Sequence, residues 1–453
     1  MQTVIDVPAW IDQRRLSRTQ LLVLVLCAAT AILDGFDAQI IGYVAPALAE
    51  SLKVARPSLS TVFAAGTSGL MLGCLFIAPL ADWLGRRRVI IGSVLFFSVM
   101  SLATARADSL EAVIALRFLT GLGLGGSMPN IIALTAEYFP ARSRATMTMT
   151  MFTGFPLGAS LGGFLAAHLI PQYGWPSVFI AGGLLPLVLG ALLWLRLPES
   201  IRYLVAKGTM AARVEAILRR IDRQASFPAG AKFVSHEEHA HGLTVRHLFR
   251  EGRTLGTIAI WVMYFMSLLD IFLLSSWLPT VLHDRGLSLG LSVVATALLQ
   301  GGGVVASLSL GRVVDRLGFL VVMLPTYVVA GVAIALIGSG GDSVILLMVT
   351  TFLAGAGVIG GQTCLNVLAA VYYPTYIRST GVGWGLGIGR VGSIVGPILG
   401  GLMLHAQWDH SSIFLAASVP AFIAAVAVFV MTRTERTRLA QVSAAEALAS
   451  PLD

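Results

Sequence analysis

Long apolar runs separated by short polar breaks organise the chain. Twelve of these runs contain about 20 or more residues with few charged side chains, which is the length that an α-helix needs to cross a membrane. Each run is continuously apolar and lacks the alternation of a barrel strand, so helices are expected. The predicted spans are residues 20–48, 57–82, 88–106, 110–138, 144–169, 174–196, 254–282, 289–314, 317–338, 342–372, 378–405 and 409–432.

The overall composition agrees with this pattern. Hydrophobic residues make up 56% of the 453 residues, and charged residues make up only 12%. A soluble domain is about 45–50% apolar and about 25% charged, so these few charges could not cover a soluble fold of this size. The composition therefore excludes a soluble enzyme and predicts an all-α membrane protein.

The Lys and Arg residues indicate how the chain is oriented in the membrane. With the amino terminus inside, 25 of the 31 fall on the cytosolic side, and four fall outside: Lys53, Arg56, Arg106 and Arg285. Both ends of the chain are therefore expected in the cytosol, as in an inner-membrane protein. Attraction to the anionic lipid leaflet explains the net charge of +8 without a nucleic acid partner.

A long polar stretch divides the spans into six and six. We predict that it is a cytosolic linker with an amphipathic helix near Met210 to Arg223. The predicted domains are a six-helix bundle at residues 1–196, the linker at 197–252, a second six-helix bundle at 253–435 and a cytosolic tail at 436–453.

The two halves repeat each other's sequence pattern. Asp37 precedes Asp82 by 45 residues, and Asp270 precedes Asp315 by the same 45 residues. The fourth and tenth spans also end alike, at Glu137-Tyr138-Phe139-Pro140 and Val371-Tyr372-Tyr373-Pro374. Such a duplication predicts a substrate site between the halves, near the middle of the membrane.

The loop after the second span carries a recognisable motif. Residues 78–88, Ala-Pro-Leu-Ala-Asp-Trp-Leu-Gly-Arg-Arg-Arg, resemble the helix 2–3 signature of the major facilitator superfamily. Two positions depart from that signature, because Ala78 stands for the usual first glycine and Trp83 for a basic residue. The resemblance implies two pseudo-symmetric six-helix bundles that work by alternating access.

A narrower resemblance begins in the first span. Residues 34–37, Asp-Gly-Phe-Asp, resemble the signature of the aromatic acid:proton symporter family, and residues 117–121, Glu137 and Arg390 match the pattern of that family. The resemblance covers essentially the whole chain. It implies import of a small aromatic carboxylate, such as a hydroxybenzoate, together with a proton. The alternatives are import of another organic acid, drug/proton antiport, and a transporter-like receptor.

Ionisable side chains within spans are costly, so they mark candidate sites. Five of them stand out: Asp34, Asp37, Arg117, Asp270 and Arg390. At about 1.5 Å per residue, Asp34 and Asp37 lie about 20 Å and about 24 Å from the cytosolic end of their helix. They share one helix face, and two adjacent carboxylates away from water cannot both carry charge cheaply. We therefore predict that this pair couples transport to protons.

The arginines within spans are candidates for binding the substrate. Arg390 or Arg117 is expected to hold the carboxylate of an organic anion through paired hydrogen bonds. The other possibility is that an aspartate and an arginine pair permanently and join helices. The remaining candidates for substrate binding are Asp270 and, as groups that hold the ring and its substituents, Tyr264, Trp277, Gln362, Asn366 and Trp384.

A second group of charges lies at the cytosolic surface. The family resemblance implies that Asp82, Arg86, Glu137 and Arg144 form a charge network that latches the outward-facing state. Contacts of this kind must exist in one state and break in the other, as alternating access requires.

The remaining motifs indicate no further chemistry. The three cysteines lie in apolar spans and are interpreted as core residues. His236, His239 and His241 fall in the polar linker, where a solvated loop is favoured over a metal site. No Walker A motif is present, so ATP does not drive transport. The sequence calls for no cofactor, and a monomer is sufficient.

Overall fold

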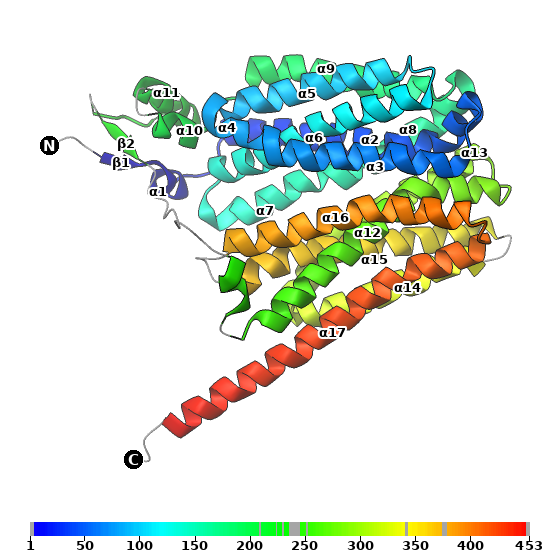
Figure 1. Ribbon diagram of the computed structural model, residues 1–453. Helices are drawn as coiled ribbons and strands as arrows, with labels where there is room; N and C mark the ends of the chain where they lie inside the picture. Colours follow the sequence, from blue (N-terminus) through cyan, green and yellow to red (C-terminus); the bar gives the residue numbers. More distant parts are fainter. Residues whose placement is uncertain are drawn as a thin grey trace. The chain divides into compact units, whose positions relative to one another are not determined.

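A computed structural model of the protein describes residues 4–207, 210–222, 224–228, 231–234, 245–250, 252–339, 343–373 and 378–449 (Figure 1). Within these ranges, twelve helical segments are long and apolar enough to span a membrane. Each predicted span overlaps one of the twelve, so the predicted helices are confirmed. The linker histidines His236, His239 and His241 lie outside the described residues.

The chain forms two compact units, Met1–His239 with Leu289–Val293, and Ala240–Ser288 with Val294–Asp453. Two spans of the first unit are not single α-helices. The second span combines α-helical, π-helical and 3-10 segments, and the fifth span is built from two α-helices. The elements of its spans are α2 (Arg18–Leu52), η1 (Arg56–Ser58), α3 (Leu59–Leu72), η2 (Gly73–Ile77), η3 (Ala78–Leu80), α4 (Ala81–Leu84), α5 (Arg86–Thr104), α6 (Leu110–Tyr138), α7 (Ala141–Phe152), α8 (Gly154–Tyr173) and α9 (Pro176–Arg196).

Small residues bring helices of the first unit into backbone contact. Helix α2 packs along α8, α3 packs along α6, and α5 packs along both α6 and α9. A Cβ atom on Gly158 would lie only 1.7 Å from the carbonyl oxygen of Ile32, and one on Gly35 only 2.0 Å from that of Phe155. Glycine at these two positions therefore allows α2 and α8 to touch.

The second unit repeats this arrangement. Helix α12 packs along α16, and α14 packs along α15 and α17. In both units, therefore, the first helix packs along the fifth, and the third packs along the fourth and the sixth. A Cβ atom on Gly392 would lie 2.3 Å from the carbonyl oxygen of Phe265. The helices are α12 (Thr254–Asp284), α13 (Leu289–Leu317), α14 (Phe319–Ser339), α15 (Val344–Tyr372), α16 (Arg378–His405) and α17 (His410–Ala449). The expected pair of similar six-helix bundles is confirmed.

Elements outside the spans gather at one end of the first unit (Figure 1). They are β1 (Val4–Asp6), α1 (Val7–Asp12), α10 (Ile201–Ala206), α11 (Ala211–Ile221) and β2 (Lys232–Val234); a further 3-10 helix, η4 (Val245–Phe249), belongs to the second unit. Helix α11 buries one apolar face, which confirms the predicted amphipathic helix. The parallel pairing of β1 with β2 was not predicted, because three-residue strands are too short to show an alternating pattern.

Candidate functional site

Two aspartates of α2 face α6 inside the first unit. Asp34 and Asp37 are 2% and 0% exposed, and residues of α6 bond to each of them. Ser127 Oγ donates a hydrogen bond to Asp34 Oδ2, whereas Asp34 Oδ1 accepts none from the described residues. The structure therefore brings the two carboxylates to one helix face, as expected from their spacing.

Arg117 of α6 pairs with Asp37. Its Nη2 atom lies 3.1 Å from Asp37 Oδ2 and donates a second hydrogen bond of 3.0 Å to the carbonyl oxygen of Asp37. Ser101 of α5 donates to Asp37 Oδ1 at 2.8 Å. The guanidinium also lies over the ring of Phe179 of α9, 5.6 Å from its centroid. Four helices, α2, α5, α6 and α9, therefore meet at one buried ion pair.

This ion pair has the geometry expected of two charges that join helices. The Arg117 side chain is only 2% exposed, and a buried charge that loses its partner is strongly destabilising. In this structure Asp37 engages only Nη2 of Arg117, whereas Nε and Nη1 have no hydrogen-bond partner among the described residues.

A third buried aspartate lies near the middle of α12. Asp270 is 0% exposed, and neither of its carboxylate oxygens accepts a hydrogen bond within the described part of the chain. Tyr264, on the same helix, is also fully buried, and its hydroxyl lacks a hydrogen-bond partner among the same residues. The Tyr264 ring packs against Gly385 of α16.

The second unit also holds an amide pair and an arginine. Gln362 and Asn366 lie one turn apart on α15, and Gln362 Nε2 donates to Asn366 Oδ1 at 3.3 Å. Arg390 of α16 is half-buried, and its side chain forms no hydrogen bond with the described residues, although its backbone carbonyl oxygen accepts one from the Ser393 hydroxyl. Of the two arginines within the spans, Arg390 is therefore the one without a carboxylate partner.

The two candidate tryptophans of the second unit lie in different surroundings. Trp277 is 2% exposed and donates from Nε1 to the carbonyl oxygen of Pro397 at 2.8 Å, which ties α12 to α16. Trp384 is exposed and stacks on Trp261, with ring centroids 5.9 Å apart. Trp277 therefore stabilises helix packing, whereas Trp384 presents an open aromatic face.

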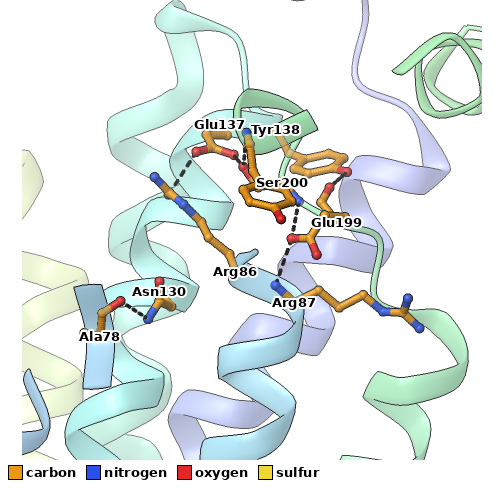
Figure 2. A network of polar contacts seen from close by, with 9 residues as sticks. Ala78, Arg86, Arg87, Asn130, Glu137, Tyr138, Glu199 and Ser200 are labelled. Atoms are coloured by element: carbon orange, nitrogen blue, oxygen red, sulfur yellow. Dashed lines mark hydrogen bonds and ion pairs between the residues drawn. The ribbon is translucent and has the colours of Figure 1, made fainter. Parts of the chain in front are cut away.

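A polar network joins the ends of several helices of the first unit, at the end expected in the cytosol (Figure 2). Arg86 at the start of α5 forms an ion pair of 2.9 Å with Glu137 near the end of α6. Ser200, just before α10, donates to the other carboxylate oxygen of Glu137 at 2.5 Å. The network therefore connects α5, α6 and the linker that follows α9.

Glu199 extends the same network to the loop between α4 and α5 (Figure 2). Its Oε1 accepts hydrogen bonds from the backbone N–H of Arg87 at 3.0 Å and of Ser200 at 2.9 Å, and its carbonyl oxygen accepts one from Tyr138 at 2.7 Å. The carboxylate packs against Gly85, which has φ of +93° and no room for a side chain. Glu199 therefore caps the amino terminus of α5.

The structure brings together some of the predicted network and leaves the rest apart. Arg86 and Glu137 are paired, and Arg144 lines a cavity of about 260 Å³ beside them, with Nε donating to the carbonyl oxygen of Phe139 at 3.4 Å. Asp82 is exposed and has no ion pair among the described residues. The four predicted gate residues therefore do not form one closed network in this structure.

Sequence reasoning missed Glu199, Ser200, Ser101 and Ser127. The first two follow Pro198 at the end of the sixth span, where a serine just before a short helix is a recognisable start signal. The serines within spans carry no such signal, because most serines there bond to a carbonyl of their own helix. Their partners across helices become visible only in the folded chain.

Replacing Glu199 with glutamine is expected to lower stability by about 1 kcal/mol, because the amino terminus of α5 loses its anionic cap. Thermal unfolding of the purified protein in detergent measures this change. Glu215→Gln is the matched control, since Glu215 pairs with Arg219 on the surface of one helix and such pairs contribute little. Equal unfolding temperatures for the two variants would contradict the capping role.

Three comparisons with known proteins bear on this site. The sequence model of the Major Facilitator Superfamily matches residues 27–391 and 260–453. A gallate transporter of Pseudomonas putida is 44% identical over 94% of this chain and 94% of its own. The 4-hydroxybenzoate transporter PcaK of Pseudomonas aeruginosa is 40% identical over 94% of this chain and 95% of its own. The crystal structure of a D-xylose-proton symporter has the same fold, with a TM-score of 0.69 over 91% of this chain and 97% of its own, at 15% identity.

Proposed function

Because this chain belongs to the major facilitator superfamily, we propose that it is a proton-coupled symporter that imports a small aromatic carboxylate of the hydroxybenzoate type. The chain is a multi-pass membrane transporter and not an enzyme. In this proposal it works by alternating access in the inner membrane, with both termini in the cytosol. One copy of the chain, surrounded by lipid, is sufficient.

The observation that carries this proposal is the similarity along almost the whole chain to transporters of gallate and of 4-hydroxybenzoate. Each of these substrates is a benzene ring with one carboxylate and at least one hydroxyl group. A site for such a molecule needs a cation for the carboxylate, an aromatic or apolar wall for the ring, and polar groups for the hydroxyls.

Side chains of the second unit supply these three kinds of group. Arg390 binds the substrate carboxylate through paired hydrogen bonds, since its guanidinium has no partner among the described residues. Gln362 Oε1, which also lacks a partner there, accepts a hydrogen bond from a ring hydroxyl, and Asn366 beside it holds a second one. The aromatic faces of Trp384 and Tyr264 hold the ring.

The first unit supplies the proton coupling. Asp34 Oδ1 has no hydrogen-bond partner among the described residues, and this carboxyl group takes up the coupled proton, because a neutral acid is far less costly than a charge inside the membrane. Asp37 shares this role through its ion pair with Arg117. Proton uptake by Asp34 and Asp37 is thereby linked to the contacts among the four helices that meet at this ion pair. In this proposal the cytosolic gate consists of Asp82, Arg86, Glu137 and Arg144.

Uptake into proteoliposomes tests this proposal. With an inward proton gradient, labelled 4-hydroxybenzoate and gallate are expected to accumulate, and a protonophore is expected to abolish the accumulation. Exchange of substrate without a gradient separates a transporter from a receptor that only binds. Accumulation of an unrelated acid alone, or drug efflux driven by the same gradient, would contradict the proposed substrate class.

A further inference from the structure

The carboxylate of Asp270 has no partner in the part of the chain that the structure describes. Its side chain is 0% exposed, and neither oxygen accepts a hydrogen bond. It lies 16 residues after the start of α12 at Thr254, which is about 24 Å along the helix. A charge at this position is shielded from solvent and has no hydrogen-bond donor among the described residues to stabilise it.

The internal repeat shows which partner is missing. Asp37 and Asp270 occupy matching positions, because each precedes the loop aspartate of its own half by 45 residues. Arg117 and Thr351 also match, because each lies 23 residues before the proline that follows the fourth helix of its unit. In the first unit an arginine pairs with the aspartate. At the matching position the second unit has a buried threonine, whose Oγ1 has no hydrogen-bond partner among the described residues.

The elements packed around this carboxylate bring few ionisable groups. Helices α14 and α15 contain no Asp, Glu, Lys, Arg or His. A neighbouring weak acid is Tyr327 of α14, and Tyr264 of α12 and Cys364 of α15 lie near Tyr327 in turn. On α16 and α17, the cationic side chains that the structure describes, such as Arg390 and Arg433, do not pair with the carboxylate.

An unpaired carboxylate in such surroundings is far costlier than a neutral acid. Asp270 therefore holds a proton in this arrangement, and it can release the proton only in an arrangement that brings water or a cation to it. We propose that Asp270 is a second proton-binding site of the transporter, which takes up one proton from one side of the membrane and releases it to the other in each cycle. This inference rests on the proposed function and deepens it.

A second proton changes the charge that moves with the substrate. A monovalent carboxylate that enters with one proton moves no net charge, whereas entry with two protons moves one positive charge inward. Uptake that uses both the first-unit pair and Asp270 should therefore respond to the membrane potential. Removal of the Asp270 proton site should abolish this response and leave the response to the pH gradient.

The test uses the full chain in proteoliposomes with a potassium diffusion potential, inside negative, and no pH gradient. The wild type is expected to accumulate 4-hydroxybenzoate under the potential alone. Asp270→Asn, which has the shape of the neutral acid but cannot release a proton, is expected to lose this accumulation, and Asp270→Glu is expected to recover part of it. A potential response that Asp270→Asn retains in full, or that the wild type lacks, would overturn the inference.

Infrared spectroscopy of the purified protein tests the same point without any substrate. A carbonyl band of a protonated carboxyl that titrates in the wild type is expected to be missing from Asp270→Asn. Tyr327→Phe, which keeps the acid and changes its surroundings, is expected to shift the band and serves if the asparagine variant does not fold. A band unchanged in both variants would refute the inference, whereas absence of hydroxybenzoate uptake by the wild type would count against the proposed function alone.

Discussion

Arg117→Ala is expected to abolish proton-driven uptake and to destabilise the first unit by about 3–5 kcal/mol. The substitution leaves the Asp37 carboxylate buried without its cation, and among the described residues Ser101 remains as its side-chain partner. It also removes a side chain that spans the space between α6, α2 and the Phe179 ring. Thermal unfolding in detergent measures the stability, and uptake in proteoliposomes measures the activity.

A double variant separates the ion pair from the other roles of Arg117. In Asp37→Asn with Arg117→Met, neither partner is left as an unpaired charge, so stability is expected to recover relative to Arg117→Ala. Proton-driven uptake is expected to stay absent, because the first unit has lost a carboxylate that the proposed coupling uses. If the double variant is no more stable than Arg117→Ala, the pair with Asp37 is not what Arg117 contributes.

Arg390→Ala is expected to raise the KM for 4-hydroxybenzoate by about 10- to 100-fold, the loss expected for charge-assisted hydrogen bonds to a carboxylate. Little change in unfolding temperature is expected, because the Arg390 guanidinium has no partner among the described residues. The measurement is the substrate dependence of the initial uptake rate at a fixed pH gradient.

Two further variants control this result. Arg390→Lys keeps the charge but cannot form the paired hydrogen bonds, so an intermediate KM is expected. Arg106→Ala removes the same charge from an exposed position and is expected to leave the KM unchanged. An unchanged KM in Arg390→Ala would show that another group binds the substrate carboxylate.

Together, these variants distinguish two arginines that look alike in sequence. Each is a single cation within an apolar span, and either could bind a substrate anion. Arg117 is expected to affect stability and coupling together, whereas Arg390 is expected to affect affinity alone. The difference follows from the presence of Asp37 beside one arginine and the lack of a described carboxylate beside the other.

The sequence by itself determined the twelve helices, the division into two similar bundles, and the set of ionisable side chains within the spans. These features depend on local quantities. The thickness of the bilayer sets the length of each apolar run. Because a buried charge is costly, an ionisable residue within such a run is easily recognised in the sequence. The spacing of three residues between Asp34 and Asp37 was likewise enough to place both on one helix face.

Only the tertiary structure decided which partner each of these groups has. Asp37 and Arg117 are 80 residues apart in sequence, and Glu199 accepts a hydrogen bond from the first turn of α5, 112 residues before it. Such pairings depend on how closely two helices approach and on which way each side chain points, and glycine contacts such as that of Gly158 with Ile32 set the approach. The same spacing pattern occurs in both halves, yet Asp37 is paired and Asp270 has no partner among the described residues. The position that matches Arg117 in the second half is a threonine, Thr351.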